Sequence, residues 1–342
     1  MIADGGLATE LEARGHDLSD ALWSARLLAD APEEIEATHR AFFAAGARIA
    51  TTASYQASFD GFAARGIGRT EAARLLRHSV ALAARARDAI AAHDRTTAPA
   101  RTRTTGPARP GAAEAAGHPG TGDSAVPPRP APTRWVAASV GPYGAALADG
   151  SEYRGRYGRS VAALRDWHRP RLEVLAEAGP DLFALETVPD TDEAAALAEA
   201  VRGLGVPAWL SFTIAGDRTR AGQPLAEAFA IAAEIPEIVA TGVNCCDPAE
   251  VAEAITLARE VTTKPVIVYP NSGEDWDPAT RRWTTPAPHT RTGTAPIIDP
   301  VTPARDWTRR GAKIIGGCCR VRPSQIHDLH LRLSPETGAS QC

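Results

Sequence analysis

The stretch AWLSFTIAGDRTRAGQPLAEAFAIAAEIPEIVATGVNCC, residues 208–246, contains two short apolar runs with an amphipathic run between them. The apolar runs at 208–213 and 239–244 have the length and composition of buried β-strands. The run at 225–234 has the periodicity of a helix. Strand, helix and strand in this order form the repeating unit of α/β proteins with a parallel sheet.

The same alternation continues over most of the chain, and it predicts a (β/α)₈ TIM barrel, with a doubly wound open sheet as the alternative. A length of 342 residues suits one barrel domain, which we place at residues 1–338. The expected strands are residues 1–3, 48–52, 135–140, 182–187, 208–213, 239–244, 265–269 and 313–316. The expected helices are residues 33–45, 70–92, 161–178, 192–202, 225–234, 248–261, 303–310 and 323–333.

Two segments depart from the regular pattern. Only three residues precede Asp4, so we expect a short, weak first strand or a natural start upstream. Residues 93–133 are rich in Pro, Gly, Ala, Thr and Arg and nearly devoid of large apolar side chains. Such a segment buries too little area to offset its ordering entropy. We therefore predict a disordered insertion between the second helix and the third strand.

Composition and charge exclude several classes of protein. The chain is 44% hydrophobic and 23% charged, as in ordinary globular proteins. A formal net charge of −4 gives no overall basic field for nucleic acid or membrane surfaces. We see no run long enough to span a membrane and no signal peptide, so we expect a cytoplasmic protein.

Cysteines are the most informative residues. Cys245 directly follows one predicted strand, and Cys318 and Cys319 follow another. Because the carboxyl ends of barrel strands meet at one face, we expect the three thiols in one pocket. Thiolates favour zinc, and three protein ligands leave a fourth position open, as in catalytic sites. The alternatives are buried small hydrophobic residues or a redox thiol pair, and Cys246 and Cys342 have no assigned role.

The chemistry of three thiolates on zinc narrows the function. The site carries an excess negative charge, which suits a substrate thiol better than water activation. Coordination would deprotonate that thiol and leave it able to attack a methyl group on a sulfonium. These residues therefore point to thiol alkylation.

Motifs along nearly the whole chain resemble homocysteine S-methyltransferases of the branch that uses S-methylmethionine or S-adenosylmethionine. The motifs are DGGLATELEARG (4–15), TTASYQAS (51–58), GPYGAALADGSEYRGRY (141–157), LETVPD (185–190), GVNCC (242–246), YPNSGEDWD (269–277) and GGCCR (316–320). The resemblance implies a zinc-binding barrel that methylates homocysteine to methionine. It implies Cys245, Cys318 and Cys319 as zinc ligands, and Asp4 and Glu186 as the groups that hold the homocysteine ammonium.

Other residues at predicted strand ends are candidates for the substrate site. Gly5 would offer its backbone N–H, and Asn244 would orient the substrate or a ligand. Thr51 and Tyr55 would line the pocket, although Tyr55 could equally pack in the core. For the cationic donor, Asp275, Trp276 and Asp277 are candidates, with a solvated loop as the preferred interpretation.

Two other functions stay open at this point. One is a sister thiol or selenol methyltransferase, for example with selenocysteine as acceptor. The other is a zinc- or thiol-binding protein without turnover. The expected partners are small molecules, with no nucleic acid and no membrane, and the sequence does not indicate an oligomeric state.

Overall fold

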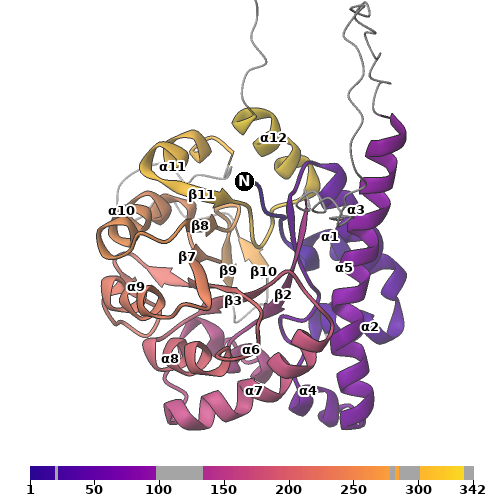
Figure 1. The fold of residues 1–342 in the computed structure, drawn as a ribbon, viewed down its shortest axis with the longest axis horizontal. Coiled ribbons are helices and arrows are strands. Elements are labelled where there is room, and N and C mark those ends of the chain that lie inside the picture. Colours follow the sequence, from indigo (N-terminus) through magenta and orange to yellow (C-terminus); the bar gives the residue numbers. More distant parts are fainter. Residues whose placement is uncertain (20–21, 98–133, 278–281, 285–300, 335–342) are drawn as a thin grey trace, which may run out of the picture.

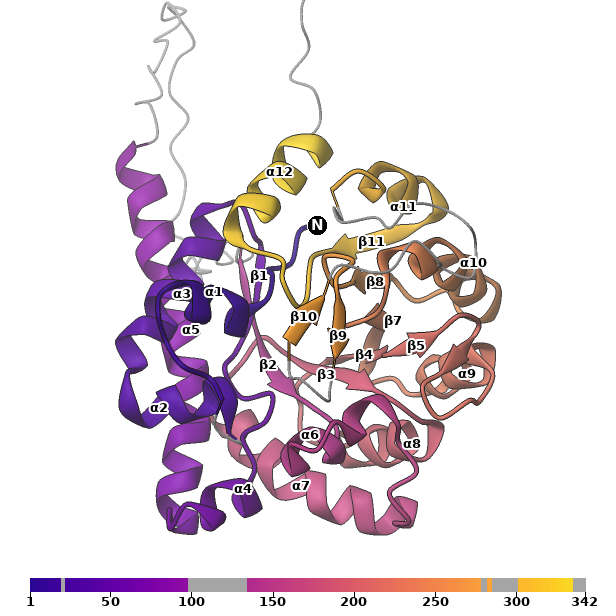
Figure 2. The same ribbon diagram turned by 180° about the vertical axis from the view of Figure 1, so that it is seen from behind.

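The computed structural model describes residues 1–19, 22–97, 134–277, 282–284 and 301–334. At its centre lies a parallel sheet of seven strands, surrounded by helices (Figure 1), and the reverse view shows the same arrangement (Figure 2). The strands follow the order β1 (Ile49–Thr51), β2 (Trp135–Val140), β3 (Leu182–Val188), β4 (Ala208–Phe212), β7 (Ile238–Asn244), β8 (Val266–Tyr269) and β11 (Ala312–Ile315).

Residues 2–3 close this sheet into a barrel. Ile2 forms a parallel bridge with Ile315 of β11, and Ala3 forms one with Ile49 of β1. The backbone N–H of Ala3 donates to the Ile315 carbonyl at 2.9 Å, and the N–H of Asp4 donates to the Ile49 carbonyl at 3.0 Å. This short segment therefore takes the eighth strand position, which confirms the predicted barrel with a short first strand.

Helices follow the strands as predicted, with ends that differ by a few residues. They are α3 (Pro32–Ala44), α5 (Arg69–Thr97), α7 (Val161–Glu177), α8 (Thr191–Ala200), α9 (Leu225–Glu234), α10 (Val251–Val261), α11 (Ala304–Arg310) and α12 (Pro323–Leu333). Side-chain caps fix two of the starts: Ser160 accepts from the Ala163 N–H and Asp190 accepts from the Glu193 N–H.

One predicted boundary is wrong. Residues 93–97, which we expected in the insertion, continue α5, because the helical pattern of that segment extends beyond residue 92. The rest of the predicted insertion, residues 98–133, lies outside the described residues, as do residues 335–342 with Cys342.

Short elements in the loops were not predicted. They include α1 (Leu7–Ala13), α2 (Leu27–Asp30), α4 (Phe59–Ala64), α6 (Tyr143–Leu147), the 3₁₀ turns η1 (Trp23–Arg26), η2 (Ser151–Tyr153) and η3 (Pro248–Glu250), and two small hairpins. In one hairpin β5 (Ile214–Ala215) pairs with β6 (Arg218–Thr219). In the other, β9 (Asp275–Asp277) pairs antiparallel with β10 (Arg282–Thr284), so residues 275–277 form a short strand within the connection after β8. Whether these residues are solvated or contact the donor stays a prediction.

The barrel has an inner and an outer core. The inner core is small: Trp209 and Ile267 pack there against alanines from neighbouring strands, such as Ala137, Ala184 and Ala240. The larger outer core lies between strands and helices. Gly242 in β7 allows close strand contact, because a side chain at that position would overlap the Ile267 backbone. Within the described residues, no helix has both the length and the apolar character needed to cross a membrane.

Candidate metal centre

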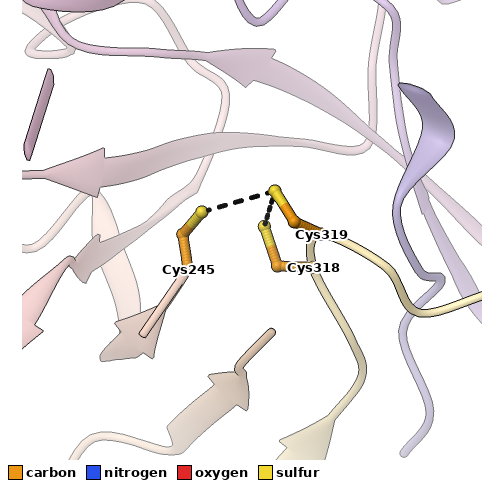
Figure 3. A group of neighbouring side chains, drawn as sticks. All are labelled: Cys245, Cys318 and Cys319. Atoms are coloured by element: carbon orange, nitrogen blue, oxygen red, sulfur yellow. Dashed lines mark hydrogen bonds between the residues drawn. The ribbon is translucent and has the colours of Figure 1, made fainter. Parts of the chain in front are cut away.

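Three thiols meet at the carboxyl ends of the strands. Cys245 follows β7, and Cys318 and Cys319 follow β11. Their sulfur atoms point toward one another (Figure 3), at 3.7 Å between Cys245 and Cys319 and 4.0 Å between Cys318 and Cys319. All three sulfur atoms lie within 4.8 Å of one another. The structure thus brings together the cysteines that the sequence placed in one pocket.

The backbone fixes the direction of the Cys245 side chain. Cys245 has a φ of +50°, in the left-handed region, which turns the chain sharply at the end of β7. Its N–H donates to the Tyr269 carbonyl at 3.2 Å, and its carbonyl accepts from the Thr213 hydroxyl at 3.1 Å. Cys245 is therefore held both by Thr213, the residue after β4, and by the last residue of β8, and its thiol is buried.

The other two cysteines are fastened to the loop after β8. The N–H of Cys318 donates to the Pro270 carbonyl at 2.7 Å. The N–H of Cys319 donates to the Asn271 side chain at 3.2 Å, and the Ser272 N–H donates to the Cys319 carbonyl at 3.1 Å. The Asn271 N–H also donates to the Cys246 carbonyl at 3.0 Å, so this loop links the Cys318–Cys319 pair to the segment that carries Cys245.

These distances fit a metal ion. Zinc with bonds of ~2.3 Å to tetrahedral thiolates places the sulfur atoms ~3.8 Å apart. The separations of Cys319 from Cys245 and from Cys318, 3.7 and 4.0 Å, lie close to that value. A soft trigonal donor set with a fourth side facing a pocket can hold a metal and still accept a further ligand.

The Cys245 thiol differs from the others in the hydrogen bonds that it receives and in their effect on its pKa. Bonds from Cys318, Cys319 and Tyr153 lower the pKa of the Cys245 thiol, although burial opposes them. The Tyr153 hydroxyl lies 3.0 Å from the Cys245 sulfur. Cys246, by contrast, is fully buried, and burial raises the pKa of its thiol. Cys245 is therefore suited to act as a thiolate ligand, while Cys246 belongs to the core.

A pocket lies beside the three thiols. It encloses about 110 Å³ of space open to water, and three of the five predicted substrate residues line it: Gly5, Thr51 and Glu186. Tyr55, Trp23 and Tyr269 add aromatic surface to the wall. The metal cluster and these residues therefore share one cavity.

Two carboxylates near the pocket are held by hydroxyl groups. Asp4 accepts from the Thr51 N–H at 2.8 Å and from its hydroxyl at 3.1 Å. Glu186 accepts a hydrogen bond from the Ser139 hydroxyl. Burial raises the pKa of Asp4 well above its usual range and that of Glu186 to about 7, in both cases against these hydrogen bonds. A bound cation would favour the ionised form of both groups.

Asn244 is buried and bonded to protein groups. Its amide contacts Thr187 and the Ser211 hydroxyl, and it does not belong to the residues that line the pocket. Gly5 lies just before α1, where a side chain would overlap the Val321 carbonyl. The requirement for glycine at this position thus has a steric cause.

The sequence did not single out several residues that line the pocket, and three of them carry polar groups close to the thiols or the carboxylates. Glu152 and Tyr153 lie in η2, and Tyr269 ends β8. The Tyr269 hydroxyl accepts from the Trp209 indole at 2.8 Å and lies 2.6 Å from the Ser211 hydroxyl. The sequence feature that could have indicated Glu152 and Tyr153 is their position within the motif at residues 141–157.

Comparison with known proteins settles the family. The homocysteine S-methyltransferase family model matches residues 1–333. The chain is 40% identical over 331 residues to the homocysteine S-methyltransferase YbgG of Bacillus subtilis (strain 168). The aligned region covers 96% of this chain and 93% of the relative. The chain belongs to the homocysteine S-methyltransferase family. The resemblance seen in the motifs is thereby confirmed.

Two other members of the family add detail. The metallated form of the homocysteine methyltransferase MmuM from Escherichia coli superposes with a TM-score of 0.77, at 38% identity, over 97% of this chain and 96% of that one. The selenocysteine Se-methyltransferase of Brassica oleracea var. italica is 39% identical over 97% of this chain and 88% of the relative. Members of this methyltransferase family therefore differ in the acceptor for which they are named.

Proposed function

We propose that this protein transfers a methyl group from a sulfonium donor, S-methylmethionine or S-adenosylmethionine, to the thiol of homocysteine. The product is methionine. The observation that carries the proposal is the convergence of three thiols, two anchored carboxylates and one pocket at the carboxyl end of the barrel. Membership of the homocysteine S-methyltransferase family supports it.

We propose zinc as the metal, held by Cys245, Cys318 and Cys319. Zinc is supported by the all-thiol donor set and by sulfur separations near the tetrahedral value. When bound, it would supply a fourth position at which a substrate thiol loses its proton.

The carboxylates would orient the amino acid. Asp4 and Glu186 are both buried and close enough for Glu186 to raise the pKa of Asp4 by charge repulsion. Because Thr51 and Ser139 fix them, they would receive the α-ammonium of homocysteine without rearrangement. Gly5 would offer its N–H to the carboxylate end, and Asn244 would act indirectly, by positioning Thr187.

The transfer itself needs no general base. The homocysteine sulfur, as thiolate, forms a bond to the donor methyl carbon while the bond from that carbon to the sulfonium sulfur breaks. The bonding pair stays on the donor sulfur, which leaves as a neutral thioether. The protein contributes alignment, and well-oriented reactants gain ~7–11 kcal/mol in this way.

The test is methyl transfer by the purified, zinc-loaded protein. Homocysteine with a deuterated carbon chain and S-methylmethionine should give deuterated methionine, detected by mass spectrometry. The Cys318→Ser protein is the control and should give none. A protein that binds zinc but forms no deuterated methionine with either sulfonium donor would contradict the proposal and favour a binding role.

Selenocysteine is the second candidate acceptor, because a 39% identical relative is named for it. A direct competition between homocysteine and selenocysteine for limiting donor decides the matter. A preference for homocysteine in kcat/KM supports the first proposal, and a preference for selenocysteine replaces it with the second.

A further inference from the structure

Glu152 is a buried carboxylate in the wall of the pocket with an oxygen that has no partner. The residue is only 9% exposed and lies in η2 among the residues that line the cavity. Its Oε2 atom is buried and makes no hydrogen bond within the described part of the chain. Asp4 and Glu186 differ in this respect, because hydroxyl groups of the protein already bind them.

The turn that carries Glu152 is firmly placed. Asp149 accepts from the Ser151 N–H at 3.0 Å, which closes the start of the turn. At Gly144 of α6 a side chain would come within 2.5 Å of the Glu152 nitrogen, so the turn packs directly on that helix. The next residue, Tyr153, places its hydroxyl 3.0 Å from the Cys245 sulfur. Glu152 is thus fixed one residue away from a contact to the metal centre.

The surroundings of Glu152 are negative. The pKa of Glu152 is raised to about 7, mainly by burial and also by the charges of Cys245 and Asp149, against a hydrogen bond from its own backbone. An ionised carboxylate that is buried close to other negative charges costs free energy unless a cation binds next to it. The cation that a sulfonium-dependent enzyme regularly admits is its donor.

We propose that Glu152 binds the α-ammonium group of the sulfonium methyl donor. This inference rests on the proposed function, and it names the part of the pocket that takes the second substrate. The ligand class is a sulfonium α-amino acid, which includes both S-methylmethionine and S-adenosylmethionine.

The ammonium is a better partner than the sulfonium for a physical reason. The positive charge of the sulfonium is partly lost by the transition state, so a carboxylate beside it would stabilise the ground state more and slow the reaction. The ammonium keeps its charge throughout. A carboxylate bound there tightens donor binding without raising the barrier.

The experiment compares Glu152→Gln with the wild-type protein by calorimetric titration of S-methylmethionine into the zinc-loaded protein without homocysteine. Removing one partner of a buried ion pair should weaken binding by at least about tenfold. The KM for the donor should rise by a similar factor, while kcat changes by less than about threefold because the ammonium charge is the same in both states. The affinity for homocysteine should not change.

Glu237→Gln is the matched control. Glu237 also has a buried Oε2 without a hydrogen-bond partner among the described residues, but it lies before the start of β7, at the opposite end from Cys245. This variant should bind the donor as the wild type does. Trimethylsulfonium, which lacks an ammonium group, should bind Glu152→Gln and the wild type equally. Zinc content and thermal unfolding show whether each variant is folded.

The outcomes separate the two proposals. Wild-type turnover together with unchanged donor affinity in Glu152→Gln overturns the inference and leaves the proposed function standing. The inference is also wrong if the variant loses affinity for homocysteine instead, or for trimethylsulfonium to the same extent. A wild-type protein that neither binds nor uses a sulfonium donor overturns both. If Glu152→Gln does not fold, Glu152→Asp is the second variant. It keeps the negative charge but places the carboxylate one methylene farther from the ligand, and it should show the same loss of donor affinity.

Discussion

Asn244 at the end of β7 holds Thr187 at the end of β3 through two hydrogen bonds. Its Oδ1 accepts from the Thr187 N–H, and its Nδ2 donates to the Thr187 hydroxyl, both at 2.8 Å. Thr187 has a φ of +60°, a strained conformation for a β-branched residue. Ser211 of β4, the strand between them, donates to the same Oδ1 at 2.7 Å. The amide thus fixes the residue after Glu186.

Asn244→Ala should disturb both stability and activity. The change leaves the buried Thr187 N–H without its acceptor, and an unsatisfied buried group costs ~1–3 kcal/mol. The Ser211 hydroxyl loses one of its two contacts and keeps the one to Tyr269. Urea unfolding measures this cost, and kcat/KM for homocysteine should fall because Glu186 loses its neighbour's support. Asn244→Asp keeps the acceptor and should have a smaller effect. Equal activity in all three proteins would show that Thr187 needs no such support.

Serine at any of Cys245, Cys318 or Cys319 should remove the metal and the turnover. A hydroxyl is a harder and far less acidic ligand than a thiol, so the soft donor set is lost. Metal content by mass spectrometry, with circular dichroism to verify folding, is the measurement. Cys246→Ala is the control, because this buried thiol is not part of the cluster. Loss of metal from Cys246→Ala would show that the ligand assignment is wrong.

Gly242→Ala should destabilise the barrel severely. An added methyl group would overlap the Ile267 backbone, and backbone atoms of a central strand cannot move aside. Overpacking of this kind costs ~1–3 kcal/mol or more. Gly68→Ala serves as the comparison, since a side chain there meets no atom within 4 Å. Chemical denaturation of the two variants should differ clearly, and similar midpoints would refute the steric argument.

His39 should make the protein less stable in acid. It is fully buried in α3, its ring nitrogens have no partner in the described residues, and burial lowers its pKa from 6.5 to about 4. Between these pH values the unfolded chain binds the proton and the folded chain does not. Stability therefore declines as the pH falls from 6.5 to about 4, by up to about 3 kcal/mol.

The difference between wild type and His39→Leu isolates this effect from other titrating groups. The free energy of unfolding of the variant should decline less over the same pH range, because leucine takes up no proton. Urea titrations at several pH values measure both proteins. Parallel pH profiles would show that His39 is not the group responsible.

Replacing residues 98–133 by a short linker should leave the metal and the activity unchanged. Helix α5 ends at Thr97 and β2 starts at Trp135, so the segment joins the amino-terminal side of the sheet. The thiols lie at the carboxyl ends of the strands. A shorter connection also lowers the entropy cost of closing the loop, so the melting temperature should not fall. Loss of zinc from the shortened protein would contradict this.

The sequence predicted the strands and the meeting of the cysteines, because both follow from local patterns. Alternating apolar runs located β7 and β11, and parallel strands necessarily end at one face. The contact of Tyr153 with Cys245 could not be predicted from the sequence. It depends on how the loop between β2 and α7 folds back over the barrel, and its 3₁₀ turn has no strong periodic signal.

The hydrogen-bond partners of the site residues could not be predicted from the sequence either. Asp4 and Thr51 are recognisable as strand-end residues, but their mutual bond arises only when the barrel closes. The extension of α5 to Thr97 was not predicted, because residues 93–97 contain no large apolar side chain and resemble the segment that follows them. Features that follow from a local sequence pattern were predicted, whereas contacts between segments far apart in the chain were not.

The bridge between Ile2 and Ile315 has a consequence for synthesis on the ribosome. Residues 2–3 are translated long before Ile315 and keep one edge unpaired until β11 has left the ribosome. Such distant pairing is slow and leaves intermediates exposed to aggregation. Cys318 and Cys319 follow Ile315 within a few residues. The nascent chain therefore closes its barrel and completes its ligand set at the same late moment, and cannot acquire a finished metal site before then.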